Sequence, residues 1–202
     1  MTDLTAFALV CSLTPSPEPS SSDLMAQHIL DQFAERGIST SSARVVDHNV
    51  AAGVQKDMGN GDEWPSLREK ILVADIFVLS TPIWMGHPSS LAQRVMERLD
   101  ADIAETDEEG RPIMAGKVAV VAVVGNEDGA HKTVADMMQG LNDIGFSLPS
   151  QGSTYWVGEA MQSVDFKDLA EVPETVATTT AGLVRNAQHL AKLLRQENFP
   201  LE

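Results

Sequence analysis

The sequence predicts an α/β fold, a three-layer sandwich in which a five-stranded parallel sheet carries helices on both faces. Short apolar runs alternate with longer segments of helical periodicity along the whole chain, which is typical of parallel strands joined by crossover helices. The run 117-KVAVVAVVG-125 is apolar on both faces, as an internal parallel strand should be. No internal repeat or linker divides the sequence, so we expect a single domain over residues 1–202.

The first half of the chain is expected to supply three strands and two helices. In order, these are a strand over 6–11, a helix over 24–37, a strand over 43–47, a helix over 64–73 and a strand over 75–80. Met25, Ile29 and Phe33 recur at helical spacing in the first helix. Ser20 is placed to cap that helix at its start, and Gly37 to end it.

The second half continues the alternation after a helix with Leu91, Val95 and Leu99 on one stripe. The later elements are expected to be a strand over 117–125, a helix over 129–144, a strand over 153–158 and a helix over 174–196. The acidic insert at 102–112 is expected to be a solvated loop, with a flap or a subunit contact as the alternative.

Composition limits the partners of the protein. Asp and Glu number 29 against 14 Lys and Arg, giving a net charge of −15. Nucleic acid and anionic membranes are therefore not expected as partners, because both require a positive protein surface. Cys11 is the only cysteine, which excludes an internal disulfide, and the histidines are too scattered for a metal site. With no signal peptide or long apolar run in the sequence, we expect a cytoplasmic protein.

Three loops are expected to meet at one edge of the sheet. In the flavodoxin-type strand order 2-1-3-4-5, the first, third and fourth strands are neighbours, and ligands bind beyond their carboxyl ends. The loops at 12–22, 81–90 and 125–131 follow these strands. The sequence therefore predicts a ligand site where they converge.

The first loop suits a phosphate monoester. It offers the hydroxyls of Ser12, Ser20, Ser21 and Ser22 and the N–H groups of a helix start, which attract anions. The loop contains no lysine, so we expect a phosphate to be held without a counter-charge. The alternative is a solvent-exposed loop with an ordinary serine cap.

The second and third loops suit a flat polar ring. The second loop reads Thr81, Pro82, Ile83, Trp84, Met85 and Gly86, and the third reads Gly125, Asn126, Glu127, Asp128 and Gly129. Proline restricts the backbone and glycine allows a close approach, so the second loop could offer N–H groups beside an aromatic side chain. The third could serve the edge of a pyrimidine-like ring. The alternatives are a buried packing role for Trp84 and a turn in which Asp128 caps the next helix.

Together these residues resemble the flavodoxin-like NAD(P)H-dependent FMN reductases over nearly the whole chain. The resemblance is carried by Ser12 and the serine cluster, by 81-TPIWMG-86 with 88-PSS-90, and by 125-GNEDGAH-131. It implies that the serines hold the FMN phosphate, that Pro82 to Gly86 border the isoalloxazine, and that Gly125 to Gly129 meet its pyrimidine edge. Trp156 would approach the same cleft.

The resemblance also implies an activity. The protein would pass a hydride from NAD(P)H to FMN and then to a quinone-, flavin- or dye-like acceptor, as a homodimer or homotetramer. No catalytic side chain is expected, because the cofactor carries the chemistry. His87 and His131 flank the cleft, where such histidines more often stabilise a turn. The alternatives are a flavodoxin-type electron carrier without its own small-molecule substrate and a flavin-free interaction domain.

Overall fold

Five parallel strands form the centre of the fold in the computed structural model, which describes residues 4–159 and 162–200. They lie in the order β2-β1-β3-β5-β6, and a short β4 pairs antiparallel with the end of β3. Their bounds are β1 Thr5–Val10, β2 Ser39–Arg44, β3 Ile76–Trp84, β4 His87–Pro88, β5 Val118–Val124 and β6 Ser153–Trp156. Because β4 was not predicted, β5 and β6 are the fourth and fifth predicted strands. The predicted order of the five parallel strands is therefore confirmed.

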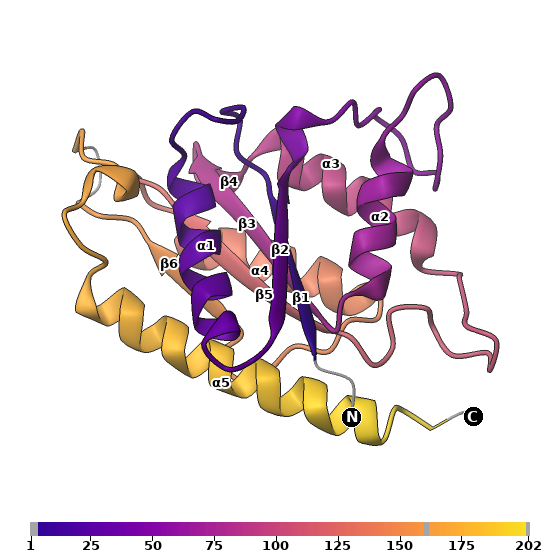
Figure 1. Ribbon diagram of the computed structural model, residues 1–202. Helices are drawn as coiled ribbons and strands as arrows, with labels where there is room; N and C mark the ends of the chain where they lie inside the picture. Colours follow the sequence, from indigo (N-terminus) through magenta and orange to yellow (C-terminus); the bar gives the residue numbers. More distant parts are fainter. Residues whose placement is uncertain (1–3, 160–161, 201–202) are drawn as a thin grey trace.

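Helices cover both faces of this sheet, as predicted. They are α1 Ser21–Ala34, α2 Trp64–Val73, α3 Ser90–Leu99, α4 Ala130–Asp143 and α5 Glu174–Gln196. Figure 1 shows the sheet close to edge-on, with α1 on one side of β2 and α2 on the other. None of the helices in the described part of the chain is both long and apolar enough to cross a membrane.

The alternation of side chains along each strand divides the core between the two faces. Phe7 and Leu9 of β1 point into a cluster with α2, α3 and α4. Ala6, Ala8 and Val10 of the same strand point into a second cluster with α1 and α5. Apolar burial on both faces explains why β1, β3 and β5 read as continuous apolar runs.

Two strands differ by more than two residues from their predicted bounds. The second strand was expected over 43–47, but β2 spans Ser39–Arg44 and residues Val45–Asp47 form a 3₁₀ turn. β2 is an edge strand whose residues 39–42 are exposed, so its sequence STSSAR lacks the apolar signal of a buried strand. β3 was expected to end at residue 80, but it continues to Trp84 because Pro82 still pairs with β5 and Ile83 pairs with β4.

The acidic insert is a mostly exposed loop, as expected, and it is anchored at its start. The side chain of Asp102 is fully buried, and its carboxylate accepts hydrogen bonds from the guanidinium of Arg68 on α2. An isolated bridge joins Thr106 to Pro112. The insert is therefore tied to the domain at its start and closed on itself.

Candidate functional site

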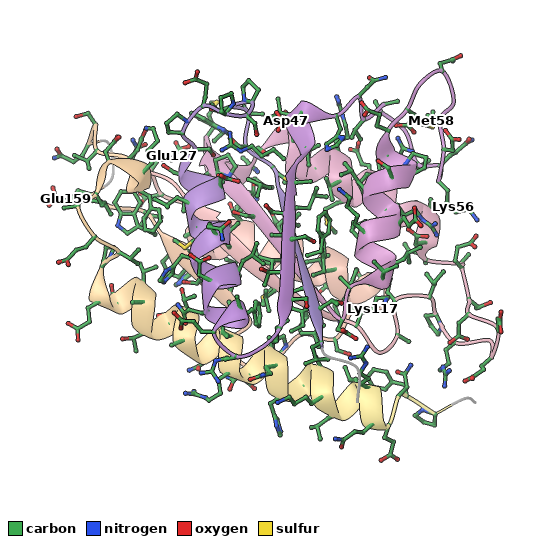
Figure 2. The ribbon with its side chains drawn as sticks, in the orientation of Figure 1. Asp47, Lys56, Met58, Lys117, Glu127 and Glu159 are labelled. Atoms are coloured by element: carbon green, nitrogen blue, oxygen red, sulfur yellow. The ribbon has the colours of Figure 1, made fainter. Side chains whose placement is uncertain are left out.

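A pocket of about 190 Å³ lies among the loops that follow β1, β3, β5 and β6. In Figure 2, Asp47 and Glu127 mark the end of the sheet where these loops lie, and Lys117 marks the opposite end. Pockets that enclose a drug-sized ligand measure roughly 300–1,000 Å³. A cofactor-sized ligand would therefore fill this pocket and also contact the open surface beside it.

Serine hydroxyls form one wall of the pocket. Ser12 follows β1 and is buried, and Ser20 caps α1. The Ser20 hydroxyl donates to Ser12 Oγ over 2.8 Å, and Ser12 Oγ also accepts from the N–H of Thr14. Ser21 and Ser22 occupy the first turn of α1, where backbone N–H groups have no partner within the helix. The wall thus combines hydroxyls with the positive end of a helix dipole.

Two residues near the end of β2 hold the outer side of this loop. The Asp47 carboxylate accepts hydrogen bonds from the hydroxyl and the N–H of Ser16. These hydrogen bonds hold the pKa of Asp47 below its ordinary value. The Arg44 guanidinium donates to the carbonyls of Thr14 and Glu18 and pairs with Asp23 at 2.8 Å. The serine wall is therefore braced without any contribution from a ligand.

A tight hairpin forms the second wall. Ile83 pairs with Pro88 and Trp84 with His87, and the two residues between them turn with positive φ (53° at Met85 and 75° at Gly86). Positive φ at both central residues is the geometry of a type I′ turn, which fits the twist of a hairpin. Trp84 is 55% exposed, so it is not a buried packing residue.

The third loop crosses the tip of that hairpin. The N–H of Met85 donates to Glu127 Oε1 over 2.7 Å. A Cβ on Gly129 would lie 2.7 Å from the Cα of Gly86, so the two backbones touch. Gly125 also packs on Ile83, where a Cβ would meet the side chain at 3.1 Å. These contacts fix the second and third loops relative to each other.

A fourth wall follows β6 and contains the 3₁₀ turn η3 (Phe166–Asp168). Trp156 lies against Phe166 with 5.6 Å between ring centroids. Asn126 Nδ2 donates to Asp165 Oδ1 over 3.2 Å, and the N–H of Lys167 donates to Ser21 Oγ over 3.2 Å. The wall is thus attached to both the third and the first loop.

The structure brings nine of the fifteen predicted site residues into the pocket lining. These are Ser12, Ser20, Ser21, Ser22, Pro82, Ile83, Trp84, Gly125 and Asn126. Trp156, which was also expected near the cleft, lines it too. Their assignment to a cofactor stays a prediction, while their convergence is a property of the fold.

The other six predicted residues lie outside the pocket lining. They are Thr81, Met85, Gly86, Glu127, Asp128 and Gly129. Thr81 is buried and its hydroxyl oxygen accepts from the N–H of Ser89. Glu127 and Gly129 contact the hairpin tip, as described above. Asp128 was considered as the cap of the following helix, but the N-cap of α4 is Gly129.

Sequence reasoning missed six lining residues, namely Leu13, Thr14, Val124, Asp165, Phe166 and Lys167. Thr14 could have been found, because it lies between the expected serines. Lys167 corrects the expectation of an anion site without a nearby cation. The signal for it was the position of residues 165–167 beyond β6, a strand that neighbours β5 and ends at the same edge of the sheet.

The histidines and the cysteine lie elsewhere. His87 Nδ1 is 3.1 Å from the ammonium nitrogen of Lys132, and His131 Nε2 is 2.9 Å from the hydroxyl of Tyr155. Neither histidine lines the pocket. Cys11 is completely buried, and burial raises the pKa of its thiol far above the ordinary value. A buried neutral thiol acts as a small apolar side chain.

The chain is similar in sequence and in structure to known proteins. Residues 5–162 match the family model described as NADPH-dependent FMN reductase. The chain is 30% identical to the 8-demethyl-8-aminoriboflavin-5′-phosphate synthase of Streptomyces davaonensis, over 97% of this chain and 80% of that protein. It is similar to the crystal structure of RosB with bound 8-demethyl-8-formylriboflavin-5′-phosphate, with a TM-score of 0.87 and 28% identity over 97% of this chain and 82% of that one.

A third relative is much longer than this chain. The chain is 34% identical, over 95% of its own length, to the divalent metal cation transporter MntH of Mycobacterium bovis. It spans only 29% of that protein.

Proposed function

Because the chain belongs to the family of NADPH-dependent FMN reductases and is a flavin-dependent oxidoreductase with FMN as cofactor and NAD(P)H as co-substrate, we propose that it reduces a small quinone-, flavin- or dye-like acceptor. The observation that carries the proposal is the convergence of the predicted loops on one pocket at the carboxyl end of the sheet. FMN, when bound, supplies the redox chemistry by accepting a hydride from the nicotinamide and returning electrons to the acceptor.

The serine wall fits the phosphate of FMN. The hydroxyls of Ser12 and Ser21 can donate to phosphate oxygens, and the first N–H groups of α1 add the positive end of the helix dipole. Ser12 and Ser20 are already aligned by their mutual hydrogen bond. Binding would therefore require little ordering of this loop.

The hairpin and the third loop fit the ring system. Trp84 offers exposed aromatic surface beside the pocket, and Gly125 and Asn126 offer backbone and amide groups at its edge. Ile83 is buried beneath Gly125, which keeps the two loops at a fixed separation. We propose that these residues position the ring and exclude water from one side of it, and that no pocket side chain acts as a general acid or base.

A matched pair of serine variants tests the proposal. FMN added to the purified protein should lose fluorescence on binding, and the complex should then oxidise NADPH or NADH in the presence of a quinone or a dye. Ser12→Ala should weaken FMN binding about 10- to 100-fold, since a hydrogen bond to a charged group contributes about 1.5–3 kcal/mol. Ser41→Ala, at an exposed serine of β2, is the control and should change nothing. Absence of fluorescence quenching would contradict the proposal.

A second candidate function follows from two relatives. One is a synthase of a modified riboflavin phosphate, and the other was crystallised with such a flavin bound. We propose as the alternative that FMN is a substrate that leaves the pocket chemically altered. Mass spectrometry of the flavin after incubation with an oxidant and an amino-group donor decides between the two: a reductase returns FMN with unchanged mass, and a synthase does not.

We also propose that the protein is a homodimer or homotetramer. Trp84 is 55% and Met85 is 87% exposed at the hairpin tip, and this apolar surface could be covered by a second copy. Sedimentation of the purified protein tests this proposal, and a monomer at all concentrations would contradict it.

A further inference from the structure

Lys167 is the only lysine or arginine among the described residues that line the pocket. We propose that Lys167 is the residue by which the site selects a flavin that carries a phosphate over one that does not. This inference rests on the proposed function, because it concerns the same pocket. It assigns a specificity role to a residue outside the serine loop.

The position of Lys167 is fixed from two sides. Its backbone N–H donates to Ser21 Oγ, which places the residue beside the first turn of α1. The preceding Phe166 is buried against Trp156, and Asp165 is bonded to Asn126. The lysine is therefore held at the boundary between the serine wall and the fourth wall.

The ammonium group of Lys167 pairs with two carboxylates but can still turn toward an anion. Its Nζ lies 2.5 Å from Asp165 Oδ2 and 3.3 Å from Asp168 Oδ2, and the side chain is 29% exposed. A lysine ammonium has three donors on a flexible stem. It can thus keep one contact with Asp165 while it directs another donor to a phosphate at the serines.

The other cation near the serine loop is not available for this role. The guanidinium of Arg44 is bonded to the carbonyls of Thr14 and Glu18 and to Asp23, and Arg44 does not line the pocket. Asp165 does line it, so without a cation the site would present a carboxylate to the phosphate. Lys167 is therefore the group that makes a dianion acceptable here.

The test compares the dissociation constants of FMN and riboflavin, which differ by the phosphate. Lys167→Gln should raise the constant for FMN on the order of 10- to 100-fold, the range of a charge-assisted hydrogen bond, and should leave that for riboflavin nearly unchanged. Lys132→Gln makes the same charge change outside the pocket, where the lysine pairs with Asp136, and should alter neither. Lys167→Arg should keep most of the preference for FMN.

Asp165→Asn provides a test of opposite sign. It removes a negative charge from the pocket while an amide can still contact Asn126, so FMN should bind more tightly and riboflavin equally well. If Lys167→Gln weakens both flavins by the same factor, or neither, the lysine is structural and the inference is overturned while the proposed function stands. If the wild-type protein binds neither flavin, the proposed function is overturned and this inference with it.

Discussion

Gly129 and Gly86 meet where the third loop crosses the hairpin tip, and Gly129 has no room for a side chain. Gly129 has φ of +117°, and a Cβ there would press on the backbone of Gly86, which cannot move as a flexible side chain could. We expect Gly129→Ala to lower the free energy of unfolding by about 2–4 kcal/mol, through strain and separation of the two loops. Urea denaturation measures the loss, and FMN affinity should fall with it.

Gly110→Ala separates backbone strain from the clash. Gly110 also has positive φ, at +86°, but a Cβ there would have nothing within 4 Å. Its replacement should cost only about 1 kcal/mol and leave FMN affinity unchanged. Equal losses in the two variants would show that the contact between the loops contributes nothing.

At this scale the sequence indicates some residues of the pocket and conceals others. The serines could be predicted because hydroxyls clustered at a helix start have a local meaning. Lys167 lies 146 residues from its contact Ser21, in a segment without periodicity, so only the folded chain brings the two together. Glu127 and Gly129 were predicted from the correct loop, but their contacts with the hairpin depend on how two loops pack.

Among the elements, α3 is joined to the loop before α2 by a buried ion pair. Arg98 and Asp62 are 2.7 Å apart, and both side chains are fully buried. Arg98 also donates to the carbonyls of Ala51 and Gln55. Burial alone would raise the pKa of Asp62, but the hydrogen bonds from Arg98 and from the backbone N–H groups of Ala51, Met58 and Trp64 outweigh it and hold that pKa below its ordinary value.

This pair predicts a stability that depends on pH. Because the pKa is lower in the folded state, the stabilisation is present above the unfolded-state pKa of about 3.9 and is lost as pH falls below it. Asp62→Asn should lower the unfolding free energy at neutral pH by about 3–5 kcal/mol, since it leaves Arg98 buried without its charge partner. The variant should also lose less further stability than the wild type between neutral pH and pH values below 4.

Asp57→Asn is the matched control for that experiment. Asp57 lies in the same loop and is exposed. Urea denaturation of this variant should reproduce both the stability and the pH dependence of the wild type. A pH dependence that Asp62→Asn leaves intact would assign acid sensitivity to other carboxylates.

The elements also differ in how well they could be predicted. The bounds of α5, Glu174–Gln196, match the predicted helix, because a long helix repeats its apolar positions many times. β2 was misplaced because an edge strand of serines and threonines is defined by its pairing with β1 rather than by an apolar pattern. β3 ran past its predicted end because pairing with β5 and β4 decides where it stops.

For the whole molecule, we propose that residues 1–202 form one domain that unfolds as a single unit. The two core clusters lie on opposite faces of the same strands, so neither can be lost while the sheet persists. Thermal unfolding followed by far-ultraviolet and near-ultraviolet circular dichroism should give coincident transitions. Two separate transitions would divide the chain into independent units and contradict the expectation.

The net charge of −15 should lower the association rate of anionic ligands. A phosphate monoester carries about −1.5 to −2 charges at pH 7, so the protein as a whole repels FMN even though Lys167 attracts it at contact.

Raising the ionic strength screens the long-range repulsion more than the contact, because the Debye length is about 10 Å at 0.1 M salt. The association rate of FMN, measured by stopped-flow fluorescence quenching, should therefore rise with salt, and that of uncharged riboflavin should not. Substitution of Lys167 should act mainly on the dissociation rate, where short-range contacts are broken. An FMN association rate that falls with salt would show that the field at the mouth of the pocket is positive despite the acidic surface.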